Sequence, residues 1–171
     1  RPTTLAEALE VLSDESLSAV PVAGCTDMMV VDHAMGRKHS GVVDILRIPE
    51  LQGVYADEQF VDIGAATAFS ELVHQTEVQK YIPILAEAAA TVGAWQIQNR
   101  ATIGGNIANA SPAGDSLPVL LALNAELVLG GNKGMRTIPY DEMHSGYRST
   151  ALEPGELIVR VRVPIPGPGT F

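Results

Sequence analysis

Residues 102–123 read TIGGNIANASPAGDSLPVLLAL, and this stretch decides how the rest of the chain is interpreted. It opens with Gly104 and Gly105, continues through small residues to Asp115, and ends in an apolar run. Small residues this dense allow a ligand or a second backbone to come close. A similar turn, residues 22–29 (VAGCTDMM), lies earlier in the chain. We predict that the two turns together hold one phosphate-containing cofactor.

The earlier turn follows a short apolar run and opens a helical segment. A helix start offers unpaired N–H groups and the positive end of the helix dipole, which favour phosphate. Gly24 lacks a Cβ that would block the approach, and Thr26 adds a hydroxyl donor. Asp27 is discordant because a carboxylate repels phosphate, so we expect its side chain to cap the helix or pair with a cation. An ordinary strand-to-helix turn remains the alternative.

The later turn offers more polar side chains. Thr102, Asn106 and Asn109 supply donors and acceptors, and Asp115 is suited to accept hydrogen bonds from sugar hydroxyls. Asp115 also precedes a helical apolar run, so a simple N-cap role stays open. For the whole stretch the alternative is tight packing of small residues against a helix.

Composition narrows the class of protein. The 171 residues are 46% hydrophobic and 18% charged, which is enough apolar content for a packed core. The net charge of −9 argues against nucleic acid or an anionic membrane surface as partner. The single cysteine, Cys25, excludes an intrachain disulfide and a multi-cysteine metal site, and we expect no bound metal. We therefore expect a reducing, cytoplasmic location, and no apolar run has the length of a membrane span.

The apolar pattern predicts two parts of different architecture. Before residue 50 we expect helix, strand, helix and strand, with the strands at 19–22 and 42–45, hence a small parallel sheet. After residue 50 we expect short strands, mostly antiparallel, and helices. We expect Trp95 in the core, and a position flanking the cofactor is the alternative. The expected helix spans residues 81–92. Four of the expected strands span residues 60–63, 125–129, 136–138 and 156–163. The last strand, ELIVRVRV, alternates and is expected to be an edge or one-sided strand.

The predicted fold class is therefore α+β with two lobes. A small parallel α/β lobe spans residues 1–50, and a larger lobe with a mixed or antiparallel sheet and helices spans 51–171. No G-x-G-x-x-G follows a strand, so a Rossmann domain is not expected. The chain begins at Arg1 and ends in a Pro/Gly-rich segment that we interpret as a linker, so we expect a piece of something larger.

Four segments of the chain match a known family. The sequence resembles the FAD-binding subunit or domain of the molybdenum hydroxylases, the xanthine dehydrogenase and carbon monoxide dehydrogenase type. The matching segments are VAGCTDMMV, IGAATAFSEL, TIGGNIANASPAGD and GYRSTALEPGELIVRVRVPIP. Cys25 stands where the family has a second glycine, so we expect it to have a negative φ and to be a small buried filler. The family's first strand and its C-terminal domain are not in this sequence.

The resemblance implies FAD as the cofactor and a set of residues that bind it. Residues of the first loop should wrap the pyrophosphate, and those of the second should lie along the flavin and its phosphates. Asp115 should bind ribityl or ribose hydroxyls, and Ile158 should pack near the isoalloxazine ring. The implied cofactor-binding residues are Val22, Ala23, Gly24, Cys25, Thr26, Asp27, Met28, Met29, Gly93, Ala94, Thr102, Gly104, Gly105, Asn106, Asp115 and Ile158. Tyr147 and Arg148 are also expected near the cofactor.

The resemblance also implies an electron-transfer role. Electrons would arrive from a molybdenum-cofactor subunit through an iron–sulfur subunit, reach FAD, and pass to NAD+, oxygen or another acceptor. No catalytic side chain is needed, because the flavin carries the redox chemistry. Two alternatives remain at this point: a free-standing FAD-dependent reductase or oxidase, and a non-catalytic interaction module.

Overall fold

The computed structural model describes residues 1–36 and 38–167, and it begins with a small parallel unit. Helix α1 (Leu5–Ser13) and the short 3₁₀ helix η1 (Glu15–Leu17) lead to β1 (Ala19–Val22). Helix α2 (Met28–Met35) then leads to β2 (Gly41–Asp44), which pairs with β1 in parallel. Residues 168–171 of the Pro/Gly-rich end lie outside the described residues.

Sequence signals account for the ends of these two helices. Thr4 caps α1, since its side chain accepts a hydrogen bond from the Glu7 N–H at 3.2 Å. Helix α2 ends at Gly36, which takes the left-handed conformation at φ 62° that glycine adopts without steric cost. The expected order of helix, strand, helix and strand is therefore confirmed.

The larger sheet has five antiparallel strands in the order β3-β4-β9-β5-β6. The 3₁₀ helix η2 (Pro49–Leu51) leads into it, and η3 (Tyr140–Glu142) follows its β6 strand. The five strands are β3 (Val54–Ala56), β4 (Phe60–Gly64), β5 (Glu126–Gly131), β6 (Gly134–Pro139) and β9 (Leu157–Pro164). Strand β9 is central, so of the two expected forms, an edge or a one-sided strand, the edge is wrong. A separate hairpin is formed by β7 (His144–Gly146) and β8 (Ser149–Thr150).

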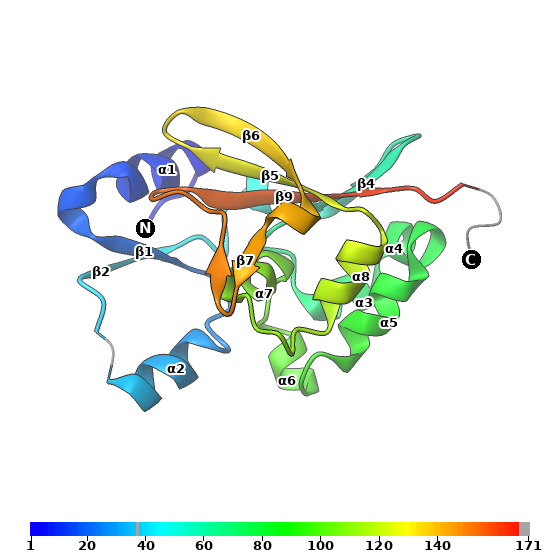
Figure 1. The fold of residues 1–171 in the computed structure, drawn as a ribbon, viewed down its shortest axis with the longest axis horizontal. Coiled ribbons are helices and arrows are strands. Elements are labelled where there is room, and N and C mark those ends of the chain that lie inside the picture. The colour runs from blue at the N-terminus through cyan, green and yellow to red at the C-terminus, as the bar shows by residue number, and fades with distance from the viewer. Residues whose placement is uncertain (37, 168–171) are drawn as a thin grey trace.

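Six helices lie between β4 and β5 in the sequence. They are α3 (Phe69–His74), α4 (Thr76–Tyr81), α5 (Pro83–Thr91), α6 (Trp95–Gln98), α7 (Ile103–Asn109) and α8 (Ser116–Ala122). Figure 1 shows α3, α4, α5 and α8 gathered below the larger sheet, whereas α1, β1, β2 and α2 lie at the end away from the C-terminus. The expected helix at 81–92 begins only at Pro83, because Pro83 disfavours helical backbone at Ile82.

Two apolar clusters hold the layers together. The larger one packs the sheet against α3, α5, α7 and α8 around the fully buried Phe69, Leu85, Ile107 and Leu127. The smaller one joins Leu5 and Leu12 of α1 to Val43 of β2 and to Leu157 and Val159 of β9. Trp95 contributes to neither cluster and is 63% exposed, so the expected core position is wrong. Because β9 enters both clusters, the parallel unit and the larger sheet share an interface.

Candidate functional site

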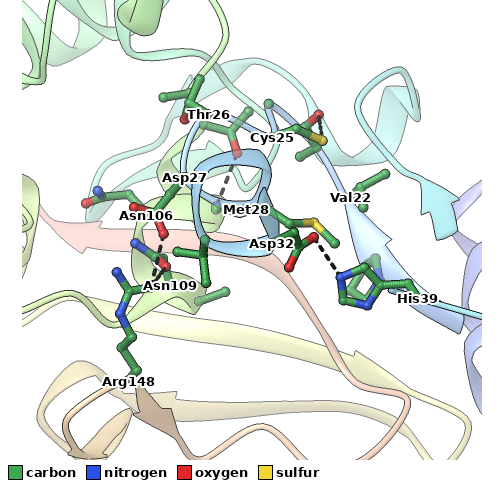
Figure 2. A pocket seen from close by; sticks show the side chains of 18 residues that line it. Val22, Cys25, Thr26, Asp27, Met28, Asp32, His39, Asn106, Asn109 and Arg148 are labelled. Carbon is green, nitrogen blue, oxygen red and sulfur yellow. Dashed lines mark hydrogen bonds and ion pairs between the residues drawn. The ribbon is translucent and has the colours of Figure 1, made fainter. Parts of the chain in front are cut away.

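A pocket of about 320 Å³ lies between residues 22–29, called here the first loop, and helix α7. Figure 2 shows its lining side chains, which come from β1 and the first loop, α2, α7 and the β7–β8 hairpin. A second pocket of about 100 Å³ adjoins it and shares the lining residues Pro21, Ala23, Thr102, Gly105 and Ala108. The two predicted turns are therefore close in space, and a shared small-residue wall connects the pockets.

The first loop is fixed by a close backbone contact. A Cβ added at Gly24 would lie 1.9 Å from the carbonyl oxygen of Arg100, so only glycine fits there. Cys25 has φ 60°, which is the left-handed region, and the expected negative φ is wrong. Its side chain is half-buried rather than buried. This conformation is the one that a glycine at that position would adopt easily.

Four backbone donors in the first loop have no protein partner. Among the described residues, no acceptor contacts the N–H groups of Gly24, Cys25, Thr26 and Asp27, all of which line the pocket. Helix α2 follows directly, and the Met29 N–H in its first turn donates to the carbonyl of Cys25, before the helix, at 3.3 Å. Unpaired backbone N–H groups in a concave loop favour an anion. The first loop can therefore bind a phosphate group through its backbone.

Helix α7 uses its own N-terminal donors within the protein. The N–H groups of Ile103 and Gly104 donate to the carbonyls of Thr67 and Ala65 at 3.1 and 2.8 Å. The Gly105 N–H donates to Thr102 Oγ1 at 3.1 Å, so Thr102 is the N-cap. These donors are therefore not available to a phosphate.

The two glycines of α7 have different surroundings. A Cβ at Gly104 would lie 2.7 Å from both the Cβ and the carbonyl oxygen of Ala65, so Gly104 is required for packing. A Cβ at Gly105 would meet only Thr102 Oγ1, at 2.9 Å. Gly105 is exposed and lines both pockets. Gly105 is therefore the position where an added side chain would enter the pocket.

Asn106 is held by a residue that the sequence did not single out. Ser116 Oγ, at the buried start of α8, donates to Asn106 Oδ1 at 2.7 Å. This bond ties the side chain of Asn106 to α8 and orients it along the pocket wall. A serine at a helix start is common, so the sequence carries no signal for this pairing.

Two carboxylates line the pocket, and each is paired with a basic side chain. Asp27 Oδ2 accepts a hydrogen bond from Arg148 at 3.0 Å, as the expectation of a cation partner requires. This bond also raises the pKa of the Arg148 guanidinium, which keeps it charged. On the other side, Asp32 Oδ2 lies 2.8 Å from His39 Nε2, and this histidine is charged only when protonated. Figure 2 shows both pairs at the pocket.

The thiol in the first loop is not an activated nucleophile. Burial raises the pKa of Cys25, and the field of Arg100 lowers it less. Cys25 Sγ donates weakly to the carbonyl of Ala23 at 3.5 Å. A neutral thiol adds no negative charge beside an anion, which suits a phosphate-binding loop.

The structure brings most of the predicted cofactor residues together. The larger pocket is lined by Val22, Ala23, Gly24, Cys25, Thr26, Asp27, Met28, Thr102, Gly105 and Asn106. Gly104 and Ile158 line the smaller pocket. Four predicted residues, Met29, Gly93, Ala94 and Asp115, lie outside both linings. Asp115 precedes α8 but makes no capping hydrogen bond, so the N-cap alternative is not supported either.

Comparison with known proteins identifies related chains. Residues 1–166 match the family described as the FAD binding domain in molybdopterin dehydrogenase. The chain is 36% identical over 169 residues to the carbon monoxide dehydrogenase medium chain of Hydrogenophaga pseudoflava, which covers 99% of this chain and 59% of the relative. It is 33% identical over 165 residues to the xanthine dehydrogenase FAD-binding subunit of Escherichia coli O157:H7, covering 96% of this chain and 56% of that one.

Solved structures agree with the sequence matches. A structure of carbon monoxide dehydrogenase from Hydrogenophaga pseudoflava superposes with a TM-score of 0.94 at 36% identity, covering 98% of this chain and 58% of the other. Quinoline 2-oxidoreductase from Pseudomonas putida 86 superposes with a TM-score of 0.93 at 28% identity, over 97% of this chain and 58% of that one. The resemblance and the α+β fold expected from the sequence are both confirmed. This chain spans less than two thirds of the length of these relatives.

Two further properties of the described residues complete the site. None of the helices in residues 1–36 and 38–167 is long and apolar enough to cross a bilayer. In the same part of the chain, no three His, Cys, Asp or Glu side chains gather where they would hold a metal ion.

Proposed function

The chain belongs to the family of FAD-binding domains of molybdopterin dehydrogenases, its cofactor is FAD, and we propose that it is the electron-transferring flavin component of a molybdenum hydroxylase. When bound, FAD supplies the redox chemistry by taking up electrons from one centre and passing them to an acceptor. The residues of this chain bind the cofactor, orient it and balance its charge.

The observation that carries this proposal is the pocket between the first loop and α7. Four N–H groups of residues 24–27 have no acceptor in the described protein and suit the FAD pyrophosphate. One of the two carboxylates in the lining, Asp27, is paired with the permanently charged Arg148, so its repulsion of phosphate is reduced. The residues present therefore fit the cofactor. The smaller pocket extends the site toward Ile158, where an apolar side chain suits one edge of a flavin.

We propose the remaining contacts in two classes. The lining residues Thr102, Gly104, Gly105 and Asn106 would lie along the cofactor as small or polar wall positions. The cofactor would have to extend beyond the two pockets to contact Met29, Gly93, Ala94 and Asp115. The relatives contain sequence beyond this chain, so further cofactor contacts outside the two pockets are compatible with the proposed site.

The division into lobes supports the same site. We propose a boundary near residue 50, because β1 and β2 form their own sheet while β3 begins the larger one. The larger pocket is then lined from both lobes. The first contributes residues 21–28, Val31, Asp32 and His39, and the second contributes Ala101, Thr102, Gly105, Asn106, Ala108, Asn109 and Arg148. FAD would therefore bridge the two lobes.

The proposed partners follow from the named relatives. The relatives include the medium chain of carbon monoxide dehydrogenase and a subunit of a 6-hydroxypseudooxynicotine dehydrogenase complex. We propose that the intact protein works beside an iron–sulfur subunit and a molybdenum-cofactor subunit, with NAD+, oxygen or another acceptor taking the electrons. Reduction of the flavin only in the presence of the partner subunits would separate this role from that of a free-standing reductase or oxidase.

The test of the site is the flavin content of the purified intact protein. We expect flavin absorbance in the wild type and its loss in a folded Gly105→Val variant, because the added side chain enters both pockets and, within the described protein, its Cβ meets only Thr102 Oγ1, at 2.9 Å. Gly41→Val is the matched control, since a Cβ there makes only ordinary contacts, the nearest at 3.6 Å from Ala19 Cβ. A wild type that rejects added FAD contradicts the function, and a Gly105→Val variant that keeps FAD contradicts the assigned pocket.

A further inference from the structure

Arg148 connects three distant parts of the chain at the mouth of the larger pocket. It lies between β7 and β8, and one terminal nitrogen, Nη1, donates to Asp27 Oδ2 at 3.0 Å and to Asn109 Oδ1 at 2.7 Å. Asp27 belongs to the first loop, whereas Asn109 ends α7. Figure 2 shows the guanidinium beside both partners. A single side chain therefore holds the first loop against α7.

The backbone of Arg148 is adapted to this position. Its φ is 51°, in the left-handed region that disfavours side chains with a Cβ. The Arg148 N–H donates to the carbonyl of Ala110 at 3.3 Å, directly after α7. An uncommon backbone conformation persists where the surrounding contacts hold it in place. The side chain is thus presented to the pocket by a constrained hairpin.

The charge of Asp27 would oppose the proposed cofactor. Asp27 lines the pocket beside the four unpaired N–H groups, and its side chain makes no helix-capping hydrogen bond. An unpaired carboxylate there would repel a pyrophosphate and compete with it for the loop donors. The overall charge of −9 supplies no compensating attraction. The positive charge of Arg148 lies 3.0 Å from this carboxylate and cancels it locally.

We propose that Arg148 is a positioning residue for the FAD pyrophosphate, which acts by neutralising Asp27 and holding the first loop against α7. The inference rests on the proposed function and extends it to a residue 121 positions away from its partner. A different role, direct contact of Arg148 with a phosphate, makes opposite predictions for a variant that lacks both charges.

The experiment measures the dissociation constant of FAD in the intact protein by quenching of flavin fluorescence. Arg148→Gln removes the positive charge, shortens the side chain and retains only an amide as donor. It leaves Asp27 uncompensated, so FAD should bind about tenfold more weakly. Arg148→Lys keeps the charge and should lose less. Asp27→Asn removes the repulsive charge and should bind FAD more tightly than the wild type. The double variant Asp27→Asn with Arg148→Gln should recover most of the affinity lost in Arg148→Gln.

Ionic strength and a matched pair serve as controls. The loss in Arg148→Gln should be larger at low than at high ionic strength, because salt screens exposed charges. Arg162 and Asp62 form a pair with the same 3.0 Å distance on the larger sheet, outside both pockets. Arg162→Gln should leave FAD affinity unchanged, because the carboxylate that it leaves uncompensated, that of Asp62, is not in the site.

Specific outcomes overturn the inference. Wild-type affinity in Arg148→Gln does so, and so does a double variant that binds FAD as weakly as Arg148→Gln, because neutralising Asp27 would then contribute nothing. If Arg148→Gln does not fold, the double variant alone decides, because weak FAD binding by a folded double variant contradicts charge compensation. Failure of the wild type to bind FAD overturns the proposed function instead.

Discussion

The left-handed backbone of Cys25 is the residue-scale feature that most constrains the first loop. A Cβ in this conformation costs about 1–2 kcal/mol relative to the usual regions. The conformation is maintained because Gly24 packs against the Arg100 carbonyl and the Met29 N–H bonds the Cys25 carbonyl. The loop therefore keeps the shape of a glycine pair with only one glycine present.

We expect replacements of Cys25 to separate backbone strain from side-chain packing. Cys25→Gly relieves the backbone strain but raises the conformational entropy of the unfolded chain. The two effects oppose each other, so the free energy of unfolding should change by less than about 1 kcal/mol. Cys25→Val places a β-branched side chain at positive φ and should cost about 2 kcal/mol or more. Denaturant unfolding measures both values. A Cys25→Val variant as stable as the wild type would show that the loop relaxes to another conformation.

At the scale of elements, strand β9 shows what an alternating sequence can predict. Asp62 of β4 and Glu126 of β5 both stand opposite Arg162 in β9, so the charged positions of three strands share one face. The alternation in ELIVRVRV correctly indicated a one-sided strand. It did not distinguish an edge from a centre, because that depends on strands distant in the sequence. Strand β1 was predicted correctly from its own apolar run and the following turn.

An ion pair between β6 and the segment before β9 gives a pH dependence. Arg136 donates to both carboxylate oxygens of Glu156, at 2.8 and 2.7 Å. The hydrogen bond from Arg136 holds the pKa of Glu156 below its ordinary value. A carboxyl with a lowered folded pKa stabilises the protein above its unfolded pKa, and this contribution disappears as the pH falls through the folded pKa.

We therefore expect Glu156→Gln to be less stable than the wild type at neutral pH. The difference in unfolding free energy should shrink as the pH falls below about 4, where the carboxyl of the unfolded chain is protonated. Urea unfolding across this range measures it. Glu87→Gln is the control, because Glu87 is exposed and has no ion pair in the described part of the chain. A Glu156→Gln difference that stays constant with pH would contradict the assigned role.

At the scale of the molecule, the pocket joins segments that the sequence alone could not bring together. The two loops were recognisable because each combines small residues with polar ones. The contacts of Asp27 with Arg148 and of Asn106 with Ser116 were not, because a single sequence contains no record of long-range pairing. The hydrogen bonds from the N–H groups of Ile103 and Gly104 to Thr67 and Ala65 were not predictable for the same reason, since the acceptors lie in another part of the fold.

Removal of FAD should lower the stability of the whole domain. A ligand that binds only the folded state at a free concentration 100 times its dissociation constant stabilises by about 2.7 kcal/mol. Because the pocket lies between the first loop and α7, we expect one cooperative thermal transition that moves upward on addition of FAD. Riboflavin, which lacks the pyrophosphate, is the control and should shift the midpoint less. Equal shifts would mean that the first loop does not bind the phosphates.

The central position of β9 has a consequence for synthesis on the ribosome. The β3–β4 and β5–β6 hairpins both precede β9 in the chain, yet neither can join the other until β9 lies between them. Until then each hairpin carries an open edge, and open strand edges pair readily with other chains. The pairings of β9 with β4 and β5 join residues that are distant in the sequence, and such contacts slow folding. The nascent chain is therefore most exposed to aggregation just before residues 157–164 emerge, and chaperones would have most effect at that moment.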